Sequence, residues 1–237
     1  MFLYNLFLYI LSPFILIRLI MYMIRNSLSL GYLFNKLSGP KNLKNKQIWI
    51  HAASIGEMKI AIELSRELIK INHTDILITS NTPTSKTLFE DSKLESVTHC
   101  YLPMDFYFVI KNFVKMVSAK LIIVIETEIW PNLYRFCERN NTKILIINAR
   151  FNNPKGILAI LSDRIYKQTL QRVDHVYCKS KKDQNGYLKY INKDKISNLG
   201  NIKYSLIKEN DNVERIIDKK YILLASSHHR EEIIIIK

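Results

Sequence analysis

Short apolar runs alternate along the chain with segments whose apolar residues recur every three to four positions, and this alternation constrains the fold more than any other feature. An apolar run of this kind is typical of a buried strand, and the three-to-four spacing is typical of a helix with one buried face. Strands that alternate with helices predict βαβ units, and hence a parallel sheet covered by helices. We therefore expect an α/β fold with a doubly wound parallel sheet. Its strands are expected at Gln47–Ala52, Asp75–Thr79, Val97–Leu102, Leu121–Ile125, Lys143–Asn148, His175–Cys178 and Ile196–Leu199.

Three of the predicted helices have recognisable first residues. Pro83 and Pro131 are each placed where a helix is expected to begin, and proline suits the first turn because its missing N–H would have no partner there. Asp105 can accept hydrogen bonds from the first turn of the helix that follows it. Ligands of such sheets bind beyond the carboxyl ends of the strands, so a site is expected among the residues directly after each strand.

The first 24 residues form an apolar segment with a single charged side chain, Arg18. About 20 apolar residues allow a helix to cross the hydrocarbon core of a bilayer. Basic residues follow this segment instead of preceding it, which is the reverse of a cleavable secretory signal and predicts that the rest of the chain stays in the cytoplasm. We expect an uncleaved membrane anchor, spanning or re-entrant, and the alternative is a buried helix of a soluble domain. Arg18 lies near the C-terminal end of the segment, and the basic residues after it are Arg25, Lys36, Lys41, Lys44 and Lys46.

The composition predicts a globular chain with an anionic partner. Hydrophobic residues make up 48% of the 237 residues and charged residues 24%, which excludes a disordered chain. The net charge of +14 favours nucleic acid, a membrane surface or a phosphorylated substrate, although an AT-rich genome also enriches a chain in Lys, Asn and Ile. The three cysteines cannot all pair and lack the spacing of metal ligands, which argues against a disulfide scaffold and a structural zinc site.

Several motifs that define common functions are absent from the sequence. It contains no glycine-rich dinucleotide motif, no P-loop and no serine-hydrolase elbow. Its basic residues are not interleaved with aromatic ones as they are in RNA-binding motifs, which disfavours nucleic acid as the partner.

The loop after the first predicted strand carries the strongest candidate for a catalytic residue. It reads His51-Ala-Ala-Ser-Ile-Gly-Glu57, and a helix is expected to follow at once. Small residues allow a sharp turn, and the N-terminus of the helix offers N–H groups to an anion. Glu57 has two interpretations: a first-turn acid that complements the helix dipole, or a general base held at the edge of the sheet.

Later strands deliver further polar residues to the same edge. Glu126 and Glu128 follow the fourth predicted strand, and on an extended chain two such acids point in opposite directions. Glu126 is the better candidate for the cleft, and Glu128 is a candidate cap for the helix that follows. Arg150 lies after the fifth strand and suits a phosphate or a carboxylate. Lys203, after a Gly–Asn turn, is either a solvated surface charge or a contact for an anionic substrate.

In their order and spacing, these loops resemble the 3-deoxy-D-manno-octulosonic acid (Kdo) transferases of lipopolysaccharide biosynthesis. Each motif is a weak signal alone, but together they form a specific signature that extends over essentially all of residues 1–205. The apolar N-terminal segment also matches the membrane anchor of that family. The matching motifs are His51–Glu57, Thr82–Thr84, Tyr101–Asp105, Glu126–Asn132, Asn148–Arg150 and Gly200–Lys203.

The resemblance implies a GT-B glycosyltransferase, in which two Rossmann-like domains face each other across a cleft. The N-terminal domain holds the lipid acceptor in such enzymes, and the C-terminal domain binds the donor CMP-Kdo. Kdo is transferred to lipid IVA, a bisphosphorylated lipid A precursor, at the cytoplasmic face of the inner membrane, and neither a metal nor another cofactor is expected. The resemblance makes Glu57 the catalytic base and gives Glu126 and Lys203 a role in supporting the transition state.

The resemblance also predicts the domain organisation. We expect a membrane anchor at residues 1–25, an acceptor-binding Rossmann-like domain at 26–207, and a linker with the beginning of the CMP-Kdo-binding domain at 208–237. A strand is expected at Tyr221–Ala225, and the loop after it resembles the first loop of the donor domain, with His229 and Arg230 in place of an acid and a glycine.

The length of the chain bears on its activity. Two domains of this kind need roughly 400 residues, so we expect a truncated or split transferase that is inactive alone or is completed by a separate chain carrying the donor domain. The alternative is a membrane-anchored acceptor-binding module without catalytic activity.

Overall fold

The computed structural model describes residues 1–40, 43, 46–152 and 159–202, and the chain divides into two compact units, Met1–Leu206 and Ile207–Lys237. All of the described strands and helices belong to the first unit. The predicted strand Tyr221–Ala225 and the rest of the predicted donor-domain segment lie outside the described residues.

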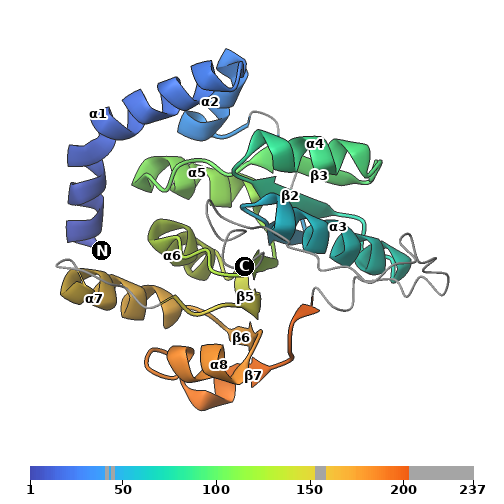
Figure 1. The fold of residues 1–237 in the computed structure, drawn as a ribbon, viewed down its shortest axis with the longest axis vertical. Helices are drawn as coiled ribbons and strands as arrows, with labels where there is room; N and C mark the ends of the chain where they lie inside the picture. The colour runs from blue at the N-terminus through green and yellow to red at the C-terminus, as the bar shows by residue number, and fades with distance from the viewer. Residues whose placement is uncertain (41–42, 44–45, 153–158, 203–237) are drawn as a thin grey trace, which may run out of the picture. The chain divides into compact units, whose positions relative to one another are not determined.

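Seven parallel strands form one sheet in the order β3-β2-β1-β4-β5-β6-β7 (Figure 1). The order runs outward from β1 in both directions, as in a doubly wound sheet. The predicted parallel α/β sheet is therefore confirmed, and the seven strands predicted between Gln47 and Leu199 are all present within two residues of their expected ends. The bounds are β1 Ile48–His51, β2 Ile76–Ser80, β3 Val97–Tyr101, β4 Leu121–Ile125, β5 Lys143–Ala149, β6 His175–Cys178 and β7 Ile196–Asn198.

Helices connect successive strands and cover both faces of the sheet (Figure 1). Two further helices precede β1, and a short 3-10 helix precedes β7. The bounds are α1 Phe2–Arg25, α2 Leu30–Ser38, α3 Ile55–Lys70, α4 Pro83–Asp91, α5 Tyr107–Val117, α6 Pro131–Arg139, α7 Ala159–Leu170, α8 Lys181–Tyr187 and η1 Lys193–Lys195.

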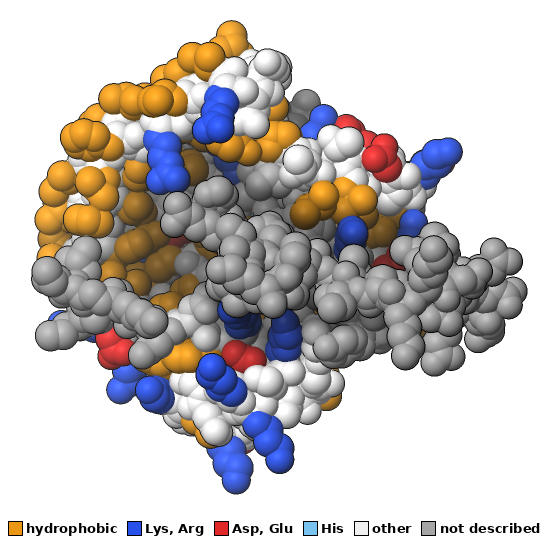
Figure 2. Space-filling view, viewed as in Figure 1, with side chains coloured by type: hydrophobic (Ala, Val, Ile, Leu, Met, Phe, Trp, Pro, Cys, Tyr) orange, Lys and Arg blue, Asp and Glu red, His pale blue; other side chains and the backbone are white. Residues whose placement is uncertain are grey.

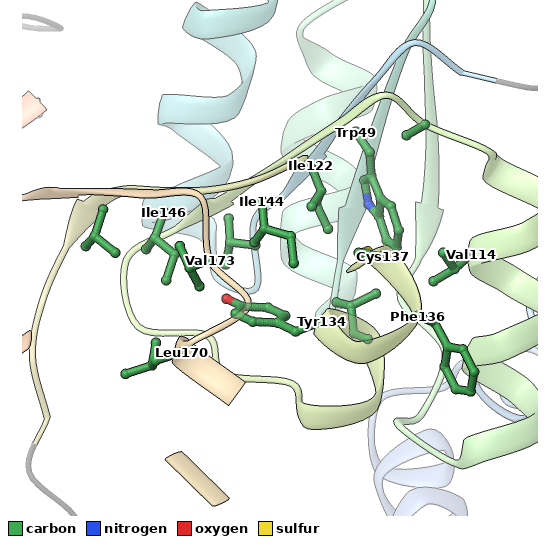
Figure 3. Packing of buried hydrophobic residues seen from close by; sticks show 14 of the residues in the cluster. Trp49, Val114, Ile122, Tyr134, Phe136, Cys137, Ile144, Ile146, Leu170 and Val173 are labelled. Carbon is green, nitrogen blue, oxygen red and sulfur yellow. The ribbon is translucent and has the colours of Figure 1, made fainter. Parts of the chain in front are cut away.

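The hydrophobic core is divided by the sheet into two clusters. One of them joins the sheet to α5 and α6, with fully buried Trp49 and Tyr134 as its largest side chains (Figure 3). The other joins the opposite face to α3, where Met58 and Ala61 are fully buried. β1, β2 and β4 lie in the middle of the sheet and are almost entirely buried, which accounts for their uninterrupted apolar sequences.

The predicted helix starts are confirmed at the two prolines and wrong at Asp105. Pro83 and Pro131 are the first residues of α4 and α6. Asp105 does not cap α5, the helix that follows it, whose N-cap is Phe106 without a side-chain hydrogen bond. Its carboxylate instead accepts hydrogen bonds from the first N–H groups of α6, at 2.9 Å from both Asn132 and Leu133. The cap is therefore made between segments that are distant in the sequence.

The apolar N-terminal segment forms one continuous helix, α1. It is long and apolar enough to cross a membrane, with a mean hydropathy of 2.1 over its most apolar window, and none of that window is buried in the protein. Hydrophobic side chains cover its outer surface, at the upper left of Figure 2. The described residues therefore do not bury this helix, as the alternative interpretation expected, and α1 is a candidate membrane anchor.

Candidate active site

The candidate site lies where the strand order reverses. β1 and β4 are neighbours in the sheet, but the chain leaves them toward opposite sides, and the crevice beyond the carboxyl ends of such a pair is where doubly wound sheets bind ligands. The loop after β1 leads to Glu57, and the loop after β4 contains Glu126 and Glu128. Two of the sequence-predicted residues, Glu57 and Glu126, thus follow the two strands that flank this crevice.

Glu57 is held by the loop that precedes its own helix. Ser54 is the N-cap of α3, and its hydroxyl donates to Oε1 of Glu57 at 2.8 Å, while the backbone N–H of Ala53 donates to Oε2 at 2.7 Å. Glu57 returns its own N–H to the Ser54 hydroxyl at 3.4 Å, so the two residues form a reciprocal capping arrangement. The glutamate is 7% exposed and has a fixed orientation. The interpretation of Glu57 as a first-turn acid at the helix N-terminus is therefore confirmed, and its role as a general base stays a prediction.

The surroundings of Glu57 raise the pKa of its carboxyl group, which makes the carboxylate a stronger base. Burial raises the pKa of Glu57 above its usual value, the hydrogen bonds from Ser54 and Ala53 oppose the rise, and the nearby carboxylate of Glu128 adds to it. A carboxylate with a raised pKa accepts a proton more readily, which is what a general base near neutral pH requires.

A buried histidine lies at the end of β1, next to the Glu57 loop. His51 is fully buried, and its Nδ1 is 2.9 Å from the hydroxyl oxygen of Thr79, which also accepts a hydrogen bond from Nε1 of Trp49 at 2.8 Å. Since Trp49 uses the hydroxyl as an acceptor, the Thr79 proton is available to Nδ1, and this network assigns the proton of neutral His51 to Nε2. That Nε2 has no hydrogen-bond partner within the described residues and lies 3.7 Å from Oε2 of Glu128.

Glu128 belongs to this group, contrary to the prediction that it caps α6. Its Oε2 accepts a hydrogen bond from Nε1 of Trp130 at 2.8 Å, and α6 takes its side-chain cap from Asp105. Burial alone would raise the pKa of Glu128, but His51, the Trp130 N–H and Lys36 outweigh this effect and hold it below its usual value. Glu128 is therefore a partly buried anion between β1 and the start of α6.

Glu126 lies in the turn directly after β4, so the alternation of an extended chain, on which its prediction rested, does not apply to it. Its backbone is left-handed, with φ at 65°, and its Oε1 accepts from Nδ2 of Asn148 at 3.4 Å. Asn148 also has a positive φ, 51°, and its Oδ1 accepts from the N–H of Ile202 at 3.2 Å. Left-handed backbone costs energy in residues other than glycine and is concentrated at functional sites. Asn148 thus joins the Glu126 loop to the segment that leads into Lys203.

Lys203 and Arg150 are the remaining residues predicted for this edge of the sheet. Lys203 lies outside the described residues, so its proposed contact with an anionic substrate stays a prediction. Arg150 follows β5 with an exposed side chain, so it is at the expected edge of the sheet. Within the described ranges no group of three or more His, Cys, Asp or Glu side chains is placed to hold a metal ion, and whether the reaction needs a metal stays untested.

Sequence reasoning missed His51 and Lys36 as parts of this edge. Lys36 comes from α2, is 5% exposed, and its Nζ donates to Oδ1 of Asn81 and to the carbonyl of Leu102, both at 2.9 Å. It was visible in the sequence only as one positive charge after the apolar segment. No local pattern connects it to loops 45 and 66 residues further along the chain.

The fold is an α/β fold like that of glycosyltransferases. A glycosyltransferase from Rickettsia africae has a solved structure that matches with a TM-score of 0.51 at 17% identity, over 67% of this chain and 43% of that one. At such identity the likeness concerns the fold alone.

Sequence comparison is more specific. A family model described as 3-deoxy-D-manno-octulosonic-acid transferase (kdotransferase) matches residues 30–206. The enzyme of that name from Haemophilus influenzae is 34% identical over 204 residues, which are 80% of this chain and 47% of the relative. The one from Rickettsia prowazekii is 29% identical over 219 residues, 86% of this chain and 46% of the relative. The chain belongs to the Kdo transferase family, and it spans about half the length of the curated relatives it matches.

Proposed function

We propose that this chain is the acceptor-binding half of a GT-B Kdo transferase, with Glu57 as its general base. The observation that carries the proposal is the position of Glu57, buried and hydrogen-bonded at the reversal point of the sheet, in a chain of this family. The donor is CMP-Kdo, and the acceptor is a hydroxyl of lipid IVA. Neither a metal nor another cofactor takes part.

The reaction requires a base because a sugar hydroxyl is a weak nucleophile. Glu57 accepts the proton of the acceptor hydroxyl while the oxygen forms a bond to the anomeric carbon of Kdo. The bond between that carbon and the CMP phosphate breaks through an oxocarbenium-like state, and its electron pair leaves with the phosphate oxygen. Lys203 and Glu126 support this step, the lysine by offsetting the charge that develops on the leaving phosphate.

The proposed domain organisation follows the same reasoning. Residues 1–25 anchor the chain, residues 26–207 bind the acceptor, and residues 208–237 lead into a CMP-Kdo-binding domain that this chain or a separate polypeptide supplies. The coverage of the relatives supports this division, since the match extends over 47% and 46% of their lengths. The alternative is an acceptor-binding module without catalytic activity. It differs from the proposed enzyme only in having no donor domain to work with.

We place the chain at the cytoplasmic face of the inner membrane, with α1 lying in the plane of the membrane surface. Contacts to the rest of the domain extend along the helix: the Tyr4 hydroxyl donates to Asp105 at 2.8 Å, Asn5 Oδ1 accepts from Asn132 at 2.7 Å, and the ring of Tyr22 lies 6.1 Å from that of Tyr32. A spanning helix would carry one of its ends across the bilayer, away from these partners.

The outer side of α1 supports the same orientation. A stripe of exposed apolar side chains repeats at alternating spacings of four and three residues, which keeps them on one face of the helix. The exposed stripe consists of Leu3, Phe7, Ile10, Phe14, Ile17, Met21 and Ile24. An interfacial helix buries such a face in the headgroup and acyl boundary.

Exchanging three stripe residues, Phe7, Phe14 and Met21, for serine is expected to weaken membrane binding at least about 100-fold, since each exchange removes an apolar contact worth about 1 kcal/mol or more even if it is only partly buried. Sedimentation with anionic vesicles measures the change. The matched control exchanges Ile71, Leu188 and Leu199, which are equally exposed but lie elsewhere. Equal binding of both triple variants would contradict the in-plane anchor.

The proposal is tested by the ligands that the chain binds alone. Reconstituted in phosphatidylcholine nanodiscs, the chain is expected to bind lipid IVA and to leave CMP-Kdo free, because the donor domain is the half that recognises the nucleotide. Surface plasmon resonance on the nanodiscs measures lipid binding, and equilibrium dialysis measures the nucleotide. Binding of CMP-Kdo without lipid IVA would reverse the assignment of the halves.

A further inference from the structure

A pocket of about 430 Å³ lies between α1 and the carboxyl edge of the sheet. One wall comes from α1 and is apolar apart from Arg18, and the rest of the lining comes from α2 and from the loops that follow β2, β3 and β4. The volume is within the usual range for a ligand site, about 300–1,000 Å³. The lining residues are Ile15, Arg18, Leu19, Tyr22, Tyr32, Lys36, Asn81, Thr82, Met104 and Trp130.

Lys36 gives this pocket a buried cation. An ammonium group has three N–H donors, and within the described residues two of them are used, by Asn81 and the carbonyl of Leu102. Both partners are neutral, and among the described residues no ion pair involves Lys36. A buried charge that lacks a directly bound counter-ion is costly, so such an arrangement favours an anionic ligand.

Arg18 adds a second cation at the rim of the same pocket. It is exposed on α1, and no ion pair of the described residues involves it. It interrupts an otherwise apolar stretch of α1 that includes Ile15 and Leu19, so the pocket combines apolar surface with two cations, Arg18 from α1 and Lys36 from α2. This combination fits an amphiphile with a phosphorylated head.

We infer that this pocket binds the phosphate-bearing sugar of the lipid acceptor, with Lys36 and Arg18 as its phosphate ligands and the α1 wall against the first part of its acyl chains. The inference rests on the proposed function and adds a specific subsite to it. An acceptor seated here enters sideways from the leaflet in which α1 lies, without leaving the membrane.

The position of the pocket distinguishes the acceptor from an ordinary anionic phospholipid. Its inner wall includes Trp130, whose Nε1 donates to Glu128, the carboxylate that faces His51 and influences Glu57. Thr82 and Asn81 in the same wall follow β2, the strand next to β1. A sugar held in this pocket is therefore beside the crevice that contains the proposed base, where its acceptor hydroxyl is needed.

The test compares binding of lipid IVA to nanodiscs that contain the full chain or its variants. Lys36→Met keeps the length of the side chain and removes the charge, and it is expected to weaken binding about 10-fold, as loss of a charge-assisted hydrogen bond does. Arg18→Gln is expected to weaken binding about threefold to tenfold, because the rim cation is partly solvated. The Arg18 variant keeps the test decisive if Lys36→Met proves unstable, since Arg18 is exposed.

Two control variants and a dephosphorylated ligand distinguish a specific phosphate subsite from a general loss of positive charge. Arg25→Gln on the same helix and Lys115→Met on α5 remove equal charges outside the pocket and are expected to leave binding unchanged. Lipid IVA without its phosphates is expected to bind equally weakly to wild type and Lys36→Met. If both pocket variants bound lipid IVA as tightly as wild type does, the subsite would be overturned while the proposed function stayed intact. The same conclusion would follow if phosphatidylglycerol at equal concentration displaced lipid IVA from the wild-type chain. Failure of the wild-type chain to bind lipid IVA at all would instead contradict the proposed function.

Discussion

Replacing Glu57 by glutamine reduces Kdo transfer about 10²–10⁴-fold, which is the contribution typical of a positioned general base. The assay contains this chain together with the donor half of the Haemophilus influenzae relative, CMP-Kdo and lipid IVA, and measures the rate at which glycosylated lipid forms. The single side-chain oxygen of glutamine can still accept from the Ala53 N–H, and the Ser54 hydroxyl can turn to accept from the new NH2 group, so the cap of α3 stays largely intact. The loss of rate then reports the missing base and not a change in fold.

The matched control for this variant is Glu67→Gln, which removes an exposed carboxylate from the same helix. It is expected to retain the full rate. A second readout is the dependence of the wild-type rate on pH: because burial raises the pKa of Glu57, the rate should rise with pH through a value above that of an ordinary glutamate. Glu57→Gln should lack this rise. A near-full rate in the Glu57 variant would exclude it as the base.

Replacing Asp105 by alanine lowers the free energy of unfolding by about 3 kcal/mol, because two N–H groups at the buried start of α6 lose a charged acceptor. Asp105 is 3% exposed and also accepts from the Tyr4 hydroxyl, so it connects α1 to α6. Burial raises the pKa of Asp105, and its hydrogen bonds from Asn132, Tyr4 and Leu133 oppose that rise. Urea unfolding in detergent, followed by circular dichroism, measures the loss.

Two further variants define the role of this carboxylate. Tyr4→Phe removes one hydrogen bond and is expected to cost about 1 kcal/mol. Asp91→Ala removes an exposed carboxylate at the end of α4 and is expected to change stability by less than about 0.5 kcal/mol. If Asp105→Ala were as stable as Asp91→Ala, the cap between Asp105 and α6 would not contribute to the fold.

The fold was largely predictable because its signals are local. The strands in the middle of the sheet are buried on both faces, so their apolar runs, such as Leu121–Ile125, have boundaries that the sequence marks clearly. Pro83 and Pro131 mark helix starts through the chemistry of their own backbone. Asp105 was assigned to the wrong helix because a capping residue next to a helix and one that reaches a distant helix are indistinguishable in sequence.

The candidate site was predictable only in part, for the same reason. Glu57 follows a strand and precedes a helix directly, so local order places it at the edge of the sheet. Lys36 reaches that edge from α2 through contacts with Asn81 and Leu102, which depend on how the first two helices pack. The pairing of His51 with Glu128 depends on β1 and β4 being neighbours, a property of the strand order that periodicity does not specify.

The most direct test of the account is the transfer reaction itself. Lipid IVA in detergent is incubated with CMP-Kdo and wild-type chain, with the donor half of the Haemophilus influenzae relative present or absent, and mass spectrometry identifies any added Kdo. We predict that Kdo is added when both halves are present and that neither half alone adds it. The account would be contradicted if the combined halves, each shown to be folded and to bind its own substrate, left lipid IVA unmodified.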